Sequence, residues 1–225
     1  MNNLKEMRKL INYILGDKAF LLITPFGFNR GNWATLRKNA FSQFTGKYEI
    51  NLIPKIEIIY KNIIQNKEPI IFDIGASYGY YSSYFCRSKQ VRVIAFEPDQ
   101  KASVLLNKLS IRNKNLLLVK KKISSIQDNN DEISFLSAVK KYGNPNLIKI
   151  DIEGYEEELL LNNLDYFKNY KTDIIVEVHS LKIENVLKLS FENIGYNVQV
   201  IDNDHKTLKI RNVQHNRWLI LSKKS

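Results

Sequence analysis

Two turns of the chain carry the residue types that bind a nucleoside. An apolar strand at 70–72 runs into Asp73, and Gly75 and Gly79 follow before a helical pattern begins. Glycine at a strand-to-helix turn lets the backbone approach a ligand closely, and the free N–H groups of the next helix favour polar or anionic groups. Glu97 ends the second strand, where a carboxylate accepts hydrogen bonds from both hydroxyls of a ribose.

The charge of the first turn narrows the choice of cofactor. The turn reads Asp-x-Gly-x-x-x-Gly rather than Gly-x-Gly-x-x-Gly. The latter pattern needs closely spaced glycines to pass a pyrophosphate, an anion beside which the carboxylate of Asp73 is unfavourable. Asp73 suits instead a cofactor with cationic groups, such as the ammonium and sulfonium of S-adenosylmethionine. This favours methyl transfer over hydride transfer, and the alternative for Glu97 is a surface acid at a strand end.

Two further carboxylates end the fourth predicted strand. Asp151 and Glu153 alternate with Ile150 and Ile152, so they point to the same side if the strand persists. They lie at the carboxyl end of the strand, where ligands bind in parallel sheets. Carboxylates there act as a general base, bind a hydroxyl or hold a metal ion, and Lys149 on the same side offsets their charge. The alternative is that they stabilise the N-terminus of the next helix.

The fifth predicted strand ends with Glu177 and His179 on one face. His179 is a candidate base or substrate contact, and a structural role is equally open. His205 and His215 fall in the region of the last two strands and are not expected to take part in chemistry. Three histidines at these separations do not form a zinc site. No metal site is therefore predicted, although a metal bridging the two carboxylates of the fourth strand stays open.

Size and cysteine content limit the class of protein. The chain has 225 residues, of which 44% are hydrophobic and 25% charged, as in one soluble domain with a sizeable core. No apolar run approaches the roughly 18 residues of a membrane span, and charges interrupt the N-terminus where a signal peptide is apolar, so a cytoplasmic location is expected. Cys86 is the only cysteine, which excludes an intrachain disulfide and favours a buried thiol.

The net charge of +11 is partly local. Residues 101–122 contain seven Lys and Arg residues and no acid. A solvated basic face is one interpretation. A site for an anionic partner is the other: nucleic acid, a phosphorylated sugar or an acidic membrane surface.

Strands alternate with helices from residue 70 onward. The expected strands are 70–74, 91–97, 115–120, 146–151, 172–179, 196–202 and 216–223, and the expected helices lie near 79–88, 99–111, 132–141, 155–168 and 181–194. This alternation predicts an α/β fold with a mostly parallel sheet covered by helices on both faces. The last two strands lack an obvious helix between them, which predicts an antiparallel hairpin at one edge.

The first part of the chain lacks this alternation. Residues 1–66 are predicted to form an N-terminal helical and loop extension, ahead of a main domain at 67–225. Helices are expected at 4–15 and 54–65. The first of them is expected to dock on the main domain, with a membrane surface as the alternative.

Four stretches of the sequence resemble the FkbM family of S-adenosylmethionine-dependent methyltransferases. They are Phe72–Gly79, Ala95–Asp99, Ile148–Glu156 and Val176–His179, and their order and spacing agree over roughly residues 68–180. The resemblance implies a seven-stranded Rossmann-like fold and O-methylation, often of sugar or polyketide hydroxyls.

The resemblance also implies roles for individual residues. The predicted cofactor-binding set is Asp73, Gly75, Ala76, Ser77, Gly79, Tyr80, Glu97 and Pro98, and the predicted methyl-transfer set is Asp151, Glu153, Glu177 and His179. The family usually has Asn where Ser77 stands. The segment between Val119 and Ile133 is short for the family, so the residues that contact adenine are not assigned.

The sequence thus predicts an S-adenosylmethionine-dependent O-methyltransferase that acts on a hydroxyl of a sugar, glycan or secondary metabolite. One alternative is a methyltransferase of RNA ribose, which the basic run favours. The other is a non-catalytic cofactor-binding scaffold. No transmembrane segment is expected, peripheral membrane contact is a further alternative, and neither the acceptor nor the oligomeric state follows from the sequence.

Overall fold

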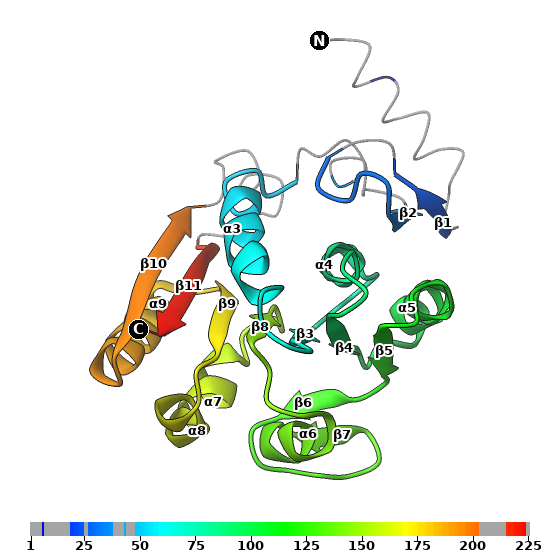
Figure 1. Cartoon of the computed structure of the whole chain (residues 1–225). Coiled ribbons are helices and arrows are strands. Elements are labelled where there is room, and N and C mark those ends of the chain that lie inside the picture. The colour runs from blue at the N-terminus through cyan, green and yellow to red at the C-terminus, as the bar shows by residue number, and fades with distance from the viewer. Residues whose placement is uncertain are drawn as a thin grey trace.

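The structure is a computed structural model, which describes residue 6 and residues 19–24, 27–37, 43, 48–202 and 215–223. Its central strands are β3 (Ile70–Ile74), β4 (Arg92–Phe96), β5 (Leu116–Val119), β8 (Leu147–Ile150), β9 (Asp173–Val178), β10 (Tyr196–Asp202) and β11 (Arg217–Lys223). They form one sheet in the order β10-β11-β9-β8-β3-β4-β5 (Figure 1). Only β11 runs against its neighbours, β9 and β10. The predicted mostly parallel, seven-stranded sheet with an antiparallel edge hairpin is therefore confirmed.

Helices cover both faces of this sheet. They are α3 (Ile53–Ile63), α4 (Tyr80–Phe85), α5 (Gln100–Arg112), α6 (Phe135–Tyr142), α7 (Glu156–Leu161), α8 (Leu164–Asn169) and α9 (Leu181–Asn193). The first three pack on one face and the last four on the other, each with its own hydrophobic core. Successive strand residues point to opposite faces, so Ile71 joins the first core and Phe72 the second. This alternation explains why the strands read as continuous apolar runs.

The N-terminal region contains a hairpin that the sequence did not indicate. Strand β1 (Ala19–Ile23) pairs antiparallel with β2 (Trp33–Arg37). The loop between them brings Phe28 onto Tyr84 of α4, with ring centroids 3.7 Å apart. From α3, the Tyr60 hydroxyl donates to the Phe85 carbonyl at 3.0 Å. The helix predicted at 4–15 lies outside the described residues apart from Glu6, and a domain boundary at residue 66 stays a prediction.

Two further segments differ from expectation. Short strands β6 (Lys122–Ser124) and β7 (Glu132–Ser134) form a separate parallel pair. Strand β6 lies in a segment expected to be loop, and β7 takes the first residues of the helix expected at 132–141, which begins at Phe135. The helix predicted at 155–168 is two helices, α7 and α8, because the Asn163 side chain bonds the Leu159 carbonyl at 2.8 Å and competes with the helical pattern. Among the described residues, no helix is long and apolar enough to cross a membrane.

Candidate functional site

The turn after β3 lies directly against the end of β8. Gly75 has φ of +71°, and a Cβ there would come 1.9 Å from the carbonyl oxygen of Asp151. The N–H groups of Gly75 and Ala76 both donate to the Phe96 carbonyl, each at 3.1 Å. Only glycine allows this approach, which brings the carboxyl ends of β3, β4 and β8 together.

Glu97 connects the turn after β3 with the turn after β4. The Ser77 N–H donates to Glu97 Oε2 at 2.6 Å, and the Asp99 N–H donates to Oε1 at 2.8 Å. Burial raises the pKa of Glu97, and these N–H groups oppose that shift. A carboxylate offers about four lone-pair sites, so each oxygen has capacity for a ribose hydroxyl. Ser77 has φ of +48°, a left-handed conformation that Asn tolerates better than most residues.

Asp73 lies beneath the first turn rather than in an open cavity. Its side chain is fully buried, and Oδ2 accepts a hydrogen bond from Ser82 at 2.5 Å. Lys149 Nζ lies 3.3 Å from Oδ1 and donates to the Gly75 carbonyl at 2.9 Å. Burial lowers the pKa of Lys149, but the carboxylates of Asp73, Asp151 and Glu177 outweigh it and raise that pKa. A direct contact between Asp73 and a cofactor would require this ion pair to open.

Asp151 and Glu153 do not form the same-side pair expected from strand alternation. Strand β8 ends at Ile150, and Glu153 has φ of +56° with 88% of its side chain exposed. Both residues nevertheless border the same two cavities, with Glu153 Oε2 at 3.9 Å from His179 Nε2 and Asp151 at 3.9 Å from Lys149 Nζ. Nor does either residue cap α7, whose N-cap position is Tyr155 and has no side-chain cap hydrogen bond.

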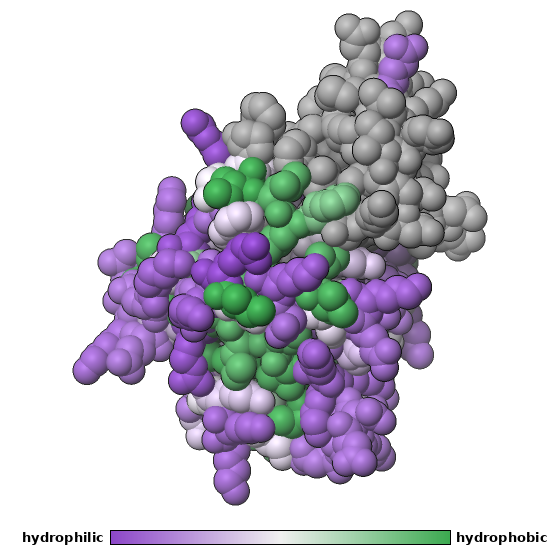
Figure 2. All heavy atoms as spheres, turned by 90° about the vertical axis from the view of Figure 1, so that its right-hand side faces the viewer, coloured by the Kyte–Doolittle hydropathy of each residue, from purple (hydrophilic) through white to green (hydrophobic). Residues whose placement is uncertain are grey.

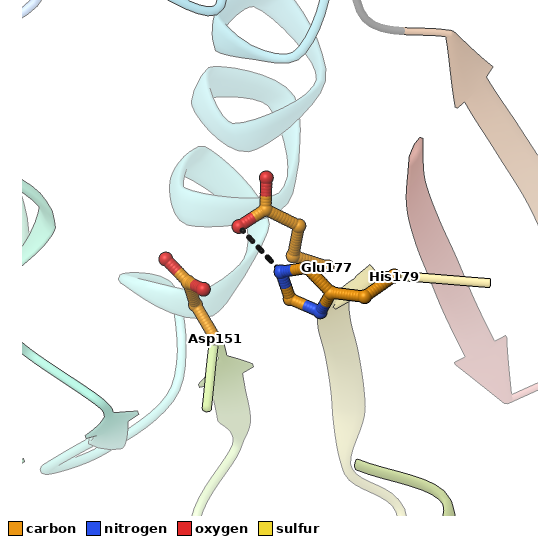
Figure 3. A group of neighbouring side chains, drawn as sticks. All are labelled: Asp151, Glu177 and His179. Carbon is orange, nitrogen blue, oxygen red and sulfur yellow. Dashed lines mark ion pairs between the residues drawn. The ribbon is translucent and has the colours of Figure 1, made fainter. Parts of the chain in front are cut away.

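Asp151 instead meets residues from the neighbouring strand. Glu177 and His179 share a face as predicted, with His179 Nε2 at 3.7 Å from Glu177 Oε2, and Asp151 faces them from the end of β8 (Figure 3). On the other side of the ring, His179 Nδ1 lies 3.0 Å from Glu156 Oε1. The hydrogen bond to Glu156 raises the pKa of His179 to about 9, although burial acts against it. His179 is therefore protonated at neutral pH.

Two cavities meet at this end of the sheet. The first has a volume of about 360 Å³ and is bordered by Gly75, Ser77, Glu97, Pro98, Ile123 and Asp151. The second has a volume of about 210 Å³ and is bordered by Thr35, Tyr48, Tyr80, Tyr81, Lys149 and Asp151. Gly75, Ser77, Asp151 and Glu153 border both cavities, so the two cavities are adjacent.

A larger cavity of about 660 Å³ lies elsewhere, between α3 and the strands β9 and β11. Asn146, Asp173 and Lys223 border it, and they lie before β8, at the start of β9 and at the end of the antiparallel β11. The larger cavity therefore lies at the amino end of the parallel strands. Ligands of such sheets bind at the carboxyl ends, so we place the site at the two smaller cavities.

The remaining predicted residues fall in two groups. Ala76 and Tyr80 border the second cavity and Pro98 borders the first. Gly79 borders neither of them, and a Cβ there would come 2.7 Å from Leu106 of α5, so its role is helix packing.

The residues outside the predicted set also have clear places. Cys86 is buried, which raises its pKa to about 12 and leaves the thiol unreactive. His215 pairs with Glu184 at 2.9 Å, away from both cavities, and His205 is outside the described residues.

The predicted site set lacked three contributors. Glu156 fixes the orientation of the His179 ring. It is the third acid of the Asp-Ile-Glu-Gly-Tyr-Glu stretch, and that position in the sequence could have identified it. Tyr48 and Tyr81 border the second cavity, and nothing in their local sequence marks them. Tyr48 reaches the site only through the fold of the N-terminal region.

Comparisons with known proteins agree with this geometry. The model of the methyltransferase FkbM domain matches residues 131–205, a segment that includes Asp151, Glu156, Glu177 and His179. No curated protein matches the chain in a sequence search.

Three solved structures illustrate the similarity of fold. A precorrin-6y C5,15-methyltransferase from Geobacter metallireducens has a TM-score of 0.51 and 15% identity, over 80% of this chain and 92% of the other. An rRNA methylase from Streptococcus thermophilus has a TM-score of 0.55 and 9% identity, over 78% and 97%. A methyltransferase FkbM from Methylobacillus flagellatus has a TM-score of 0.50 and 13% identity, over 80% and 61%.

The strand order and the turns at the carboxyl ends of β3 and β4 are those of the Rossmann-like fold, which the chain shares with solved methyltransferases. Residues 131–205, which span β7–β10, match the methyltransferase FkbM domain, and the chain shares its fold with a solved FkbM methyltransferase.

Proposed function

We propose that the chain is an O-methyltransferase that acts on a hydroxyl of a sugar, glycan or secondary metabolite. The observation that carries the proposal is the position of Asp151 between two cavities of about 360 Å³ and 210 Å³. One cavity has the features of a nucleoside site, and the other has aromatic and polar walls that suit a hydroxylated acceptor.

The first cavity fits S-adenosylmethionine, which supplies an electrophilic methyl group on a sulfonium. Glu97 holds the ribose hydroxyls, since its oxygens are fixed by two N–H groups and retain acceptor capacity. Gly75 and Ser77 form the turn along which the cofactor lies, with Pro98 and Ile123 as apolar walls. Asp73 acts indirectly, through the Lys149 ammonium that also binds the Gly75 carbonyl.

Asp151 is the residue best placed to accept the proton of the acceptor hydroxyl. It borders both cavities and keeps a quarter of its side chain exposed, 25%. His179 is protonated at neutral pH because of Glu156, so it cannot take that proton while it remains a cation. Glu177 is 1% exposed, and its Oε2 lies 3.7 Å from His179 Nε2. The enzyme contributes mainly by positioning the hydroxyl, because sugar hydroxyls are weak acids.

The cofactor half of the proposal is tested by calorimetry with S-adenosylmethionine. Glu97→Gln removes charge-assisted hydrogen bonds and is expected to weaken binding about 10- to 100-fold. Equal binding by the variant and the parent protein would remove Glu97 from the site. No binding by the parent protein would favour a scaffold without a methyl donor.

The acceptor half is tested with methyl-labelled cofactor against glycosides, lipid-linked sugars, small hydroxylated metabolites and RNA. With the acceptor found, Asp151→Asn is expected to lower kcat by about 100-fold or more. Glu153→Gln should cost only a few fold because that side chain is 88% exposed. Asp165→Asn, at an exposed position of α8, is the matched control. Full activity in Asp151→Asn would refute the assigned base.

RNA is the second candidate acceptor, because Lys121 and Lys122 border the cofactor cavity and most of the basic run at 101–122 is exposed. The face that carries α5 and β5 is not uniformly basic, however. Figure 2 shows hydrophobic side chains along its middle with hydrophilic ones on both sides, and Val104, Ile111 and Leu117 are among the exposed apolar residues. RNA binding that weakens steeply with salt, together with label transfer to RNA, would favour this acceptor over a glycan.

A further inference from the structure

We infer that Asp151, Glu177 and His179 form a binding site for a divalent cation of the Mn²⁺ type. One carboxylate oxygen from each acid and one imidazole nitrogen all lie within 4.8 Å of one another (Figure 3). Three donors around a cation at ligand distances near 2.1 Å lie up to about 4 Å apart. Small side-chain rotations therefore close this set around an ion.

The orientation of His179 is the one that a metal ligand needs. Its Nδ1 is held at 3.0 Å by the fully buried Glu156, which leaves Nε2 facing Glu177 at 3.7 Å. A ligating histidine almost always donates its other N–H to a carboxylate or carbonyl, which fixes the tautomer and the ring. Glu156 itself is anchored by the Gly154 N–H at 3.0 Å.

A second observation points to a bound ligand beside these residues. Tyr81 is 5% exposed and borders the cavity that Asp151 also borders. Its hydroxyl is buried and has no hydrogen-bond partner among the described residues. A buried hydroxyl without a partner costs about 1–3 kcal/mol. A water or acceptor oxygen in this cavity, beside Asp151, supplies the missing partner.

The donor set indicates which ions fit. Two carboxylates and one imidazole, with room for water or acceptor oxygens, suit Mn²⁺ or Fe²⁺ better than the all-oxygen site that Ca²⁺ prefers. Lys149 Nζ lies 3.9 Å from Asp151 Oδ2, and its positive charge opposes the cation, which the carboxylates of Asp151 and Glu177 offset. The role of the ion rests on the proposed function: it would bind the acceptor hydroxyl and lower its pKa.

The test is titration of the metal-free protein with MnCl₂ at slightly alkaline pH, followed by calorimetry and by the electron paramagnetic resonance signal of Mn²⁺. One strong site per chain is expected. Asp151→Asn and His179→Gln should weaken it by more than 100-fold, and Glu156→Gln by about 10- to 100-fold because it only orients the ring. Asp165→Asn should bind like the parent protein.

Two outcomes overturn the inference. One is the absence of a strong Mn²⁺ site in the parent protein, and the other is unchanged binding in both Asp151→Asn and His179→Gln. Binding of S-adenosylmethionine by His179→Gln shows that the variant is folded, since His179 borders neither cavity. Methyl transfer measured in the presence of a chelator separates the two proposals. If transfer persists and no Mn²⁺ site is found, the cation site is refuted and the proposed methyltransferase activity stands.

Discussion

The ion pair between Lys149 and Asp73 makes a sharp prediction about stability. Lys149 is 2% exposed and Asp73 is fully buried, and Nζ and Oδ1 lie 3.3 Å apart. In Lys149→Met the aliphatic stem is largely kept, but the Asp73 charge loses its cation and the Gly75 carbonyl loses its donor. Removing one partner of a buried pair typically costs about 3–5 kcal/mol. For a chain of this size, that lowers the thermal midpoint by about 6–20 °C.

The assay is urea unfolding followed by tryptophan fluorescence and circular dichroism. Lys188→Met, on the exposed face of α9, is the control and should stay within about 0.5 kcal/mol of the parent protein. The double variant Asp73→Asn with Lys149→Met removes both charges and keeps an acceptor for Ser82. It should recover about 1–3 kcal/mol relative to the sum of the single variants.

Two results would refute this reasoning. A loss below about 1 kcal/mol in Lys149→Met is what an exposed ion pair gives, and it would mean that the pair is solvated. Strict additivity in the double variant would mean that Lys149 stabilises the fold by packing alone.

The remaining predictions concern the turns and the histidine. Gly75→Ala should abolish S-adenosylmethionine binding and destabilise the protein by more than the strain of about 1–2 kcal/mol that a left-handed conformation costs. The control Gly195→Ala should show that strain alone, because nothing lies within 4 Å of its added Cβ. Equal unfolding free energies for the two variants would contradict the contact between Gly75 and the end of β8. Ser77→Asn should stabilise the protein by a few tenths to about 1 kcal/mol and keep cofactor binding, because Asn adopts φ of +48° more readily, and a drop in thermal midpoint would count against this. The hydrogen bond to Glu156 raises the pKa of His179 to about 9 from 6.5, so the stability it contributes is complete below about pH 6.5 and is lost as pH rises through about 9. In chelator, the gap in thermal midpoint between the parent protein and His179→Gln should shrink over that window, and a constant gap would show that the imidazolium is not stabilised by its carboxylates.

Local sequence was sufficient for most of the fold because the strands are short, apolar and separated by helical patterns. It also located Gly75, Glu97 and the end of β8, since these positions depend on where a strand stops. It failed where a residue's conformation depends on distant contacts. The hairpin β1–β2 has no clear strand alternation, and its loop is held by the aromatic contact of Phe28 with Tyr84.

The candidate site divides in the same way. The sequence by itself determined which acids and which histidine stand at the carboxyl ends of β8 and β9, because strand ends and alternation are local properties. Only the tertiary structure decided their partners. The turn at Glu153 breaks the alternation, and the sheet order places β9 beside β8, so Asp151 meets Glu177 and His179, and Glu153 also lies near His179. Asp73 likewise meets Lys149 because parallel pairing of β3 with β8 sets them side by side. Such pairings depend on residues many positions apart in the chain, and their energies come from burial that no local pattern contains.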